Sequence, residues 1–379
     1  MAGTDSISQG ALTGLPAGRP AVAVSGGVDS LRALLECVEA GRAPIAVHAL
    51  FHNGPDEPAE ARLIDGLGRC CAALGAPLRV LDLREAFMER VVRPFVRSYR
   101  DGLTPNPCAR CNRAMKFGLL MDAALAEGAD IFLTGHYARL TRDGLPDGAP
   151  PMLGRAADAA KDQSYFLSLV PRTRFSRVAF PLGSTDKETT IRRVREAGLV
   201  VPAKKESQEI CFVPRGPDHY RDFLEASLRE EGLAVPGPGP IVLRGGADSG
   251  RVLGRHAGLW RYTEGQRQGL GVSWHEPLYV TGKDAATNTL HVSPRAHARL
   301  RGVHVGEVNR MLEDGSVPAR ALARLRYRQR PAPATITEDN EGLLVILDEP
   351  SSPTAPGQVA AVYDETGRVL AGGVIDALL

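Results

Sequence analysis

Short apolar runs alternate with amphipathic stretches along the first 135 residues of the chain. The apolar runs are of strand length, and the stretches between them repeat apolar residues at helical spacing, as Leu31, Leu34, Leu35 and Val38 do. The pattern predicts strands at 21–24, 45–51, 78–81 and 131–133, and helices from about 28 and over 59–74 and 115–127. Strands that alternate with helices indicate βαβ units, so we expect an α/β domain with a parallel, Rossmann-like sheet.

The periodicity changes after about residue 207. A Gly/Pro-dense connector at 232–240 precedes a predicted hairpin of 240–243 and 251–253. From residue 278 onward, short strands follow one another with turn signals between them, including 290–292, 322–328, 343–347 and 359–363. This pattern predicts a C-terminal antiparallel β-barrel. We therefore expect a loose tail at 1–18, a nucleotide-binding domain at 19–208, a small central domain at 209–277 and the barrel at 278–379.

Composition narrows the class of protein. Of 379 residues, 43% are hydrophobic and 24% charged, with a net charge of +2, which is ordinary for a globular protein. No apolar run approaches the roughly 18 residues of a membrane span, and the first ten residues lack a secretory pattern. We therefore expect a protein without a membrane partner, whose six cysteines are reduced cytosolic thiols. We further expect it to be a monomer, although the sequence does not give the oligomeric state.

The sharpest motif is Ser-Gly-Gly-Val-Asp-Ser at 25–30, between a predicted strand and a predicted helix. Glycines allow the backbone to approach an anion, the N–H groups of the helix start face it, and both serines can add hydroxyl donors. Asp29 can hold Mg²⁺ or cap the helix. The motif resembles the pyrophosphatase loop of the adenine nucleotide α-hydrolases, which split ATP into AMP and pyrophosphate. It leaves GMP synthetase, asparagine synthetase, lysidine synthetase and the tRNA thiolases open.

A second set of motifs distinguishes among these enzymes. In chain order they are NPCARCNR at 106–113, TGHYAR at 134–139, KDQSYFL at 161–167, ESQEICFV at 206–213 and YTEGQRQGL at 262–270. In this order and spacing, from about residue 20 to the C-terminus, the chain resembles the bacterial and organellar tRNA-specific 2-thiouridylases. The resemblance implies ATP-dependent thiolation of the wobble uridine of tRNA at C2, with sulfur from a protein persulfide.

The resemblance also implies site residues. ATP with Mg²⁺ would contact Ala23, Val24, Ser25, Gly26, Gly27, Val28, Asp29, Ser30, Leu50 and Gly135. The tRNA would contact Asn106, Pro107, Cys108, His136, Lys161, Asp162, Gln163, Arg326, Tyr327 and Gln358. Further expected partners are a sulfur-relay protein or a cysteine desulfurase.

The cysteines carry the expected sulfur chemistry. By resemblance, Cys211 carries the persulfide and Cys111 is the nucleophile that drives its transfer, leaving a disulfide. Cys211 has an alternative as a small buried apolar residue. Cys108 stands where the family commonly has Asp, and it creates a Cys-x-x-Cys pair with Cys111. Cys108, Cys111 and Cys211 could therefore hold a 4Fe-4S cluster instead, a rival mechanism for the same reaction.

An arginine row supports an RNA partner. Arg324, Arg326, Arg328 and Arg330 alternate with other residues, so a strand would place all four on one face, next to Tyr327. The alternative is an exposed edge strand in an Arg-rich protein. Two other functions also remain open. A ligase that adenylates a small molecule would not need the cysteine pair, and a non-catalytic iron–sulfur protein would not need residues 25–30.

Overall fold

The computed structural model describes residues 18–53, 57–203, 210–214, 216, 219–312 and 315–379. Residues 1–17 of the expected tail, the predicted domain boundary at 208 and residues 206–209 of one motif lie outside these ranges. The chain divides into two compact units. The first comprises 1–90, 108–208 and 366–369, and the second comprises 91–107, 209–365 and 370–379.

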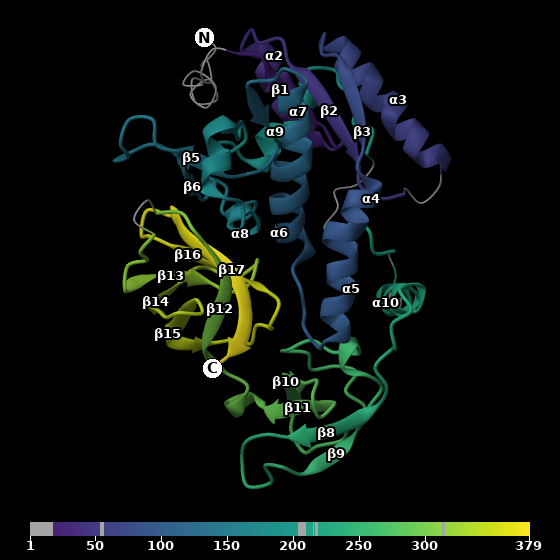
Figure 1. The fold of residues 1–379 in the computed structure, drawn as a ribbon, viewed down its shortest axis with the longest axis vertical. Helices are drawn as coiled ribbons and strands as arrows, with labels where there is room; N and C mark the ends of the chain where they lie inside the picture. Colours follow the sequence, from purple (N-terminus) through teal and green to yellow (C-terminus); the bar gives the residue numbers. More distant parts are fainter. Residues whose placement is uncertain (1–17, 54–56, 204–209, 215, 217–218, 313–314) are drawn as a thin grey trace. The chain divides into compact units, whose positions relative to one another are not determined.

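A five-stranded parallel sheet forms the centre of the first unit, with strand order β3-β2-β1-β4-β7 (Figure 1). The strands are β1 (Pro20–Ala23), β2 (Ile45–Leu50), β3 (Leu78–Asp82), β4 (Ile131–Leu133) and β7 (Val178–Ala179). Its main helices are α2 (Val28–Glu39), α3 (Glu57–Ala73), α7 (Met121–Ala126) and α9 (Lys187–Glu196). The predicted α/β class with a parallel sheet is confirmed.

Shorter elements complete this unit. They are α4 (Arg84–Phe87), the π-helices η1 (Met88–Val92) and η2 (Asn112–Leu120), α6 (Pro107–Cys111), the hairpin of β5 (Arg139–Thr141) and β6 (Met152–Gly154), α8 (Ser164–Leu167) and η3 (Arg172–Arg177). Gly118 interrupts η2 with non-helical angles, φ −98° and ψ −109°. The π-helix η2 begins directly after Cys111. π-Helical turns often occur at functional sites.

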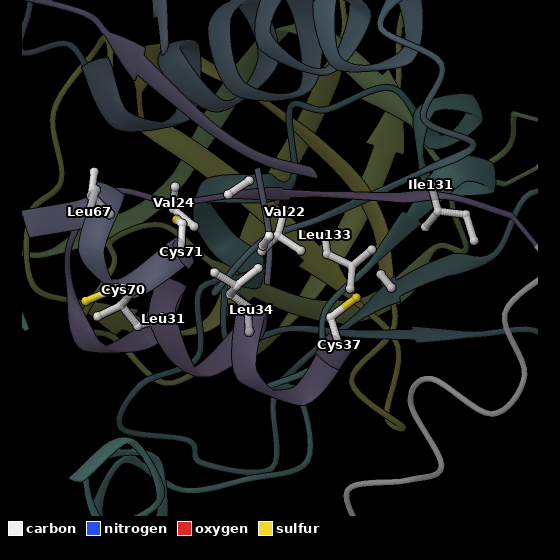
Figure 2. Packing of buried hydrophobic residues seen from close by; sticks show 14 residues of the cluster. Val22, Val24, Leu31, Leu34, Cys37, Leu67, Cys70, Cys71, Ile131 and Leu133 are labelled. Carbon is white, nitrogen blue, oxygen red and sulfur yellow. The ribbon is translucent and has the colours of Figure 1, made fainter. Parts of the chain in front are cut away.

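The core of the first unit lies between the sheet and its helices. Figure 2 shows Leu31, Leu34 and Cys37 of α2 with Val22 and Leu133 of the sheet, all buried. The apolar spacing that predicted α2 is the spacing that places these side chains on one helix face. This packing fixes the start of α2, and with it the loop at 25–30, against the carboxyl end of β1.

The second unit contains a sheet and a barrel. Its helical elements are α5 (Arg93–Arg100), α10 (His219–Glu230), η4 (Leu259–Arg261) and η5 (Arg295–His297). The four-stranded sheet has the order β10-β11-β8-β9, from β8 (Gly239–Leu243), β9 (Val252–His256), β10 (Leu278–Asp284) and β11 (Thr289–Pro294). The predicted hairpin at 240–253 is the antiparallel pair of β8 and β9.

Six strands close the barrel in the order β12-β15-β14-β13-β16-β17. They are β12 (Leu300–Arg310), β13 (Arg320–Arg324), β14 (Ala332–Glu338), β15 (Leu343–Ser351), β16 (Val359–Tyr363) and β17 (Val369–Leu378). The predicted C-terminal barrel is confirmed, but its strands begin at Leu300. The two strands at 278–294, expected in the barrel, pair with each other and with β8 instead.

The predicted strand at 322–328 is wrong beyond Arg324, where β13 ends. The Leu325 N–H donates to the Gln329 side chain (3.3 Å), and the Gln329 N–H donates to the Arg326 carbonyl (3.1 Å). These bonds close a turn in place of a sheet ladder, so the four arginines do not share one strand face. Arg324 is buried and donates to the Tyr327 carbonyl, whereas Arg326, Arg328 and Arg330 are exposed.

Candidate active site

The loop at 25–30 connects β1 to α2 and is held by its own serines. Gly26 adopts φ +82°, a backbone conformation that strains any residue with a side chain, so glycine is favoured there. Ser30 Oγ accepts from the Ser25 N–H (3.0 Å) and donates to the Gly27 carbonyl (2.9 Å). Gly27 is the N-cap residue of α2 and no side chain caps it, so the first amides of a twelve-residue helix face the loop.

Asp29, in the first turn of α2, is held by two residues from elsewhere in the unit. Its Oδ1 lies 2.6 Å from Lys187 Nζ and 2.9 Å from the Tyr137 hydroxyl. Lys187 begins α9, whose N-cap Asp186 accepts from the Thr189 N–H at 2.7 Å. Burial is the main reason that the pKa of the Tyr137 hydroxyl is raised. The hydrogen bond to Thr190 opposes this rise, and the neighbouring Asp29 adds to it. The hydroxyl therefore stays a proton donor.

The turn after β4 packs directly on this helix start. A Cβ on Gly135 would lie within 2.6–2.8 Å of the backbone of Asp29 and Ser30, so no larger residue fits there. His136 follows, and its Nδ1 lies 2.7 Å from Thr134 Oγ1. Burial, with a further contribution from the Lys116 charge, holds the pKa of His136 well below its usual value. The imidazole is therefore neutral and belongs to the interior of the unit.

The motif at 161–167 supports the same turn from the other side. The buried carboxylate of Asp162 accepts from the N–H groups of Ala156 and Ser164 (3.1 and 3.2 Å). Gln163 Oε1 accepts from the Tyr137 N–H at 2.9 Å. Asp162 and Gln163, expected at the tRNA, thus have structural partners, while Lys161 remains half-exposed.

The Cys-x-x-Cys pair occupies α6. Cys108 is exposed, whereas Cys111, at the junction with η2, is 9% exposed. The surrounding protein raises the pKa of the Cys108 thiol, and the Lys116 ammonium opposes that rise. The amide of Asn112, next to Cys111, donates to the Phe166 carbonyl at 3.0 Å. This bond ties the pair to the helix α8 that follows residues 161–163.

In the second unit, Cys211 is exposed, and its neighbour Phe212 packs edge-on against Phe95 of α5 with ring centres 5.1 Å apart. The exposed position favours a reactive thiol over the alternative of a buried packing residue. Cys111 belongs to the first unit and Cys211 to the second.

The barrel loop at 356–358 meets the segment that leads into the Cys-x-x-Cys helix. Gln358 Nε2 donates to the carbonyls of Thr104 (2.8 Å) and Pro105 (3.4 Å), and the Thr104 N–H donates to the Pro356 carbonyl (2.8 Å). Gln358, expected at the tRNA, therefore anchors the backbone just before Asn106. Arg326 and Tyr327 lie in the turn after β13.

Two further residues expected to contact ATP, Val24 and Leu50, lie at or just after the ends of strands in the parallel sheet. Val24 donates to the Val47 carbonyl at 2.8 Å, and Leu50 ends β2 with its side chain half-buried. Within the described residues, no three His, Cys, Asp or Glu side chains are gathered as a metal site, and no helix is long and apolar enough to cross a membrane.

Comparison with known proteins covers nearly the whole chain. Residues 19–215 match the model of a tRNA methyl transferase HUP domain, 222–294 a tRNA methyl transferase PRC-barrel domain, and 301–375 an aminomethyltransferase β-barrel domain. A tRNA-specific 2-thiouridylase of Nitratidesulfovibrio vulgaris (strain Miyazaki F) is 49% identical over 94% of this chain and 98% of its own. That of Lawsonia intracellularis is 42% identical, over 94% and 98%. A solved 4-thiouridine synthetase is only distantly similar, at 19% identity and a TM-score of 0.34 over 56% of this chain and 51% of its own.

Proposed function

The chain belongs to the tRNA-specific 2-thiouridylase family, a family of sulfurtransferases, and from this premise we propose that it uses ATP to thiolate the wobble uridine of tRNA at C2. The loop at 25–30 is the observation that carries the proposal. It presents backbone N–H groups and hydroxyls at the start of α2, which suits the phosphates of a nucleotide.

The chemistry needs two half-reactions, because the C2 oxygen of uracil is a poor leaving group. In the first, that oxygen attacks the α-phosphorus of ATP, forming an adenylate and releasing pyrophosphate. Mg²⁺ commonly binds through one or two carboxylates and the substrate phosphates, and Asp29 would supply such a carboxylate. The ion would supply charge neutralisation of the phosphates.

In the second half-reaction, the terminal sulfur of a persulfide on Cys211 attacks C2, and AMP leaves with the former C2 oxygen. The Cys111 thiolate attacks the inner sulfur of Cys211, so one S–S bond breaks as another forms. The resulting disulfide must be reduced before the next cycle. The exposure of Cys211 supports this role, since a persulfide donor must reach it.

The partners follow from this chemistry. A sulfur-relay protein or a cysteine desulfurase would load Cys211, and the tRNA would contact the exposed Arg326 and its neighbours, together with Asn106 and Lys161. An enzyme of this kind would act in the cytoplasm, and we expect it to act as a monomer.

Pyrophosphate–ATP isotope exchange tests the first half-reaction. Exchange should require tRNA, and Asp29→Ala should abolish AMP formation while tRNA binding persists. The matched control is Asp65→Ala, an exposed acidic residue on α3 that pairs with Arg69. Normal AMP release by Asp29→Ala would contradict the assignment of the loop.

The rival 4Fe-4S mechanism makes a different prediction for the second half-reaction. Chelator-treated, iron-free protein is given a persulfide donor, ATP and tRNA. In the persulfide route, this protein turns over fully, Cys211→Ser fails to load sulfur, and Cys111→Ser loads sulfur without transferring it. A strict iron requirement would instead support the cluster and overturn the persulfide route.

Cys108 separates the two routes further. Cys108→Asp restores the residue usual in the family and should keep or improve turnover if persulfide transfer operates. Loss of bound iron together with activity in this variant would indicate that Cys108 is a cluster ligand.

A further inference from the structure

Lys187 lies at the loop of residues 25–30, although none of the motifs quoted above includes it. Its Nζ is 2.6 Å from Asp29 Oδ1 and 6.0 Å from the centre of the Tyr137 ring. The Lys187 side chain is 14% exposed and that of Asp29 is 30% exposed. The ammonium is therefore held at the start of α2, beside the amides that would face a phosphate.

The Lys187 ammonium is largely removed from water and depends on an anion beside it. Asp29 is that anion in this structure, with its Oδ1 2.6 Å from Lys187 Nζ. A buried ammonium is costly unless an anion accompanies it, and a nucleoside triphosphate brings several negative charges.

Helix α9 does not need Lys187 in order to dock on α2. Arg193, two turns further along α9, pairs with Glu39 of α2 at 2.9 Å. Thr190 Oγ1 lies 3.0 Å from the Tyr137 hydroxyl, and Val194 is buried. These contacts hold α9 in place without Lys187. The Lys187 ammonium can therefore change its ion-pair partner while the helix stays docked.

We propose that Lys187 is a ligand of the β- and γ-phosphates of the nucleotide, and that it exchanges Asp29 for phosphate oxygens when the nucleotide binds with its divalent cation. Asp29 is thereby released to hold the cation. No bond other than ion pairs and hydrogen bonds changes, because Lys187 then pairs with phosphate oxygens and Asp29 with the cation. A flexible four-carbon stem with a compact ammonium suits such a transfer. The inference rests on the proposed function, because it takes the loop to be an ATP site.

Nucleotide affinity tests the proposal without relying on turnover. Isothermal titration of the full-length protein would measure the Kd of a non-hydrolysable ATP analogue and of AMP, each with Mg²⁺. Lys187→Met should weaken the analogue by about tenfold or more, the usual worth of one charge-assisted hydrogen bond, and should affect AMP far less. Lys187→Arg should recover part of the loss, because it keeps the positive charge.

Arg193→Met is the matched control, since it removes an α9–α2 ion pair away from the loop and should leave both affinities unchanged. Lys187→Gln, which keeps a hydrogen-bond donor toward Asp29, serves if the Met variant does not fold. Equal analogue affinity in wild type and Lys187 variants, with or without a lower melting temperature, would overturn the proposal. Failure of the wild-type protein to bind the analogue would overturn the proposed ATP site itself.

Discussion

At the scale of single residues, burial distinguishes Cys37 and Cys71 from Cys108 and Cys211. Cys37 and Cys71 lie in the core of the first unit, where burial raises the pKa of each thiol to about 11. Cys108 and Cys211 are exposed. Because the thiolate is the reactive form, Cys37 and Cys71 are packing thiols, whereas the exposed Cys211 is open to a reagent.

Alkylation should reveal this separation. In native protein at pH 8, a thiol of pKa 11 is thiolate only about one part in a thousand, so iodoacetamide should label Cys211 well before Cys37 or Cys71. Mass spectrometry of timed samples would give the order, with urea-unfolded protein as the control in which all six react. Labelling of Cys37 as fast as Cys211 in folded protein would contradict the structure.

Sequence patterns predicted the loop residues but not the side chain that holds Asp29. Arginine supplies 40 of the 46 basic residues, so lysine is rare in this chain, with only six positions. Of the lysines described, Lys116 acts on His136 and Cys108, Lys187 pairs with Asp29, and Lys283 pairs with Glu264. Lysine in an arginine-rich chain was the signal for these positions, but their partners are distant in sequence and only the fold identifies them.

His304 of β12 lies between two carboxylates, with Nδ1 2.6 Å from Asp376 and Nε2 3.3 Å from Asp339. The hydrogen bond to Asp376 is the main reason that the pKa of His304 is raised. Because the pKa of His304 is higher in the folded protein than the ordinary value of about 6.5, protonated His304 stabilises the fold fully below about pH 6.5. This stabilisation is lost as the pH rises through the pKa that His304 has in the folded protein. His304→Gln should therefore lower the unfolding free energy more at pH 6 than at pH 9.

Urea denaturation at the two pH values checks this expectation. Asp376→Asn should reproduce the pH dependence, and adding it to His304→Gln should have little further effect, because both remove the same interaction. A destabilisation of equal size at pH 6 and pH 9 would show that packing alone is affected.

At the scale of elements, a buried ion pair holds the segment that precedes the Cys-x-x-Cys helix. Lys283 of β10 and Glu264 are each 1% exposed and lie 3.4 Å apart. Lys283 Nζ also donates to Thr104 Oγ1 (3.0 Å) and to the Tyr262 carbonyl (3.1 Å). The motif at 262–270, which had no assigned role, thus supplies a charged anchor for the backbone around Thr104.

Removing one member of this pair should be severe. Lys283→Met leaves a buried carboxylate without its cation, which typically costs about 3–5 kcal/mol of unfolding free energy. The double variant Lys283→Met/Glu264→Gln should recover much of that loss. Tryptophan fluorescence in a urea titration follows this unit specifically, because Trp260 and Trp274, the chain's two tryptophans, both belong to it.

Arg229→Met is the control for that comparison, since Arg229 pairs with Glu225 on the exposed face of α10 and should contribute less than about 1 kcal/mol. A Lys283→Met variant as stable as this control would show that the pair contributes nothing to anchoring Thr104.

The prediction of helices and strands was most accurate where apolar residues recur at a regular spacing. It was least accurate where a side chain, and not a neighbouring strand, accepts the backbone hydrogen bond. The parallel strands and α2 follow from periodicity, since their apolar residues form one core. The end of β13 depends on the Gln329 side chain accepting from the Leu325 N–H, a bond that alternation of residues does not reveal. Strands β10 and β11 have the pattern of barrel strands, and only their pairing with β8 shows otherwise.

At the scale of the whole molecule, the two units divide the proposed chemistry. The loop at 25–30, Lys187 and Cys111 belong to the first, whereas Cys211, the barrel and both tryptophans belong to the second. A ligand that binds one folded unit stabilises that unit by mass action. Binding therefore gives a way to assign unfolding transitions to units.

A non-hydrolysable ATP analogue with Mg²⁺ at about 100 times its Kd should add about 2.7 kcal/mol to the unit that binds it. Differential scanning calorimetry should show a rise in one transition, while the melting curve followed by tryptophan fluorescence moves less. Equal shifts in both signals would show either that the units unfold together or that the nucleotide binds the second unit.

The closure of the barrel has a consequence for synthesis on the ribosome. β12 pairs with β15 on one side and β17 on the other, where Val303 faces Leu378 and the Leu379 N–H donates to the Gly302 carbonyl at 2.9 Å. The parallel sheet of the first unit has all its strands once Ala179 has emerged, but one edge of β12 stays open until β17 follows. Nascent chains stalled between β16 and β17 would therefore leave one edge of β12 unpaired, and such an edge can pair with another chain and favour aggregation.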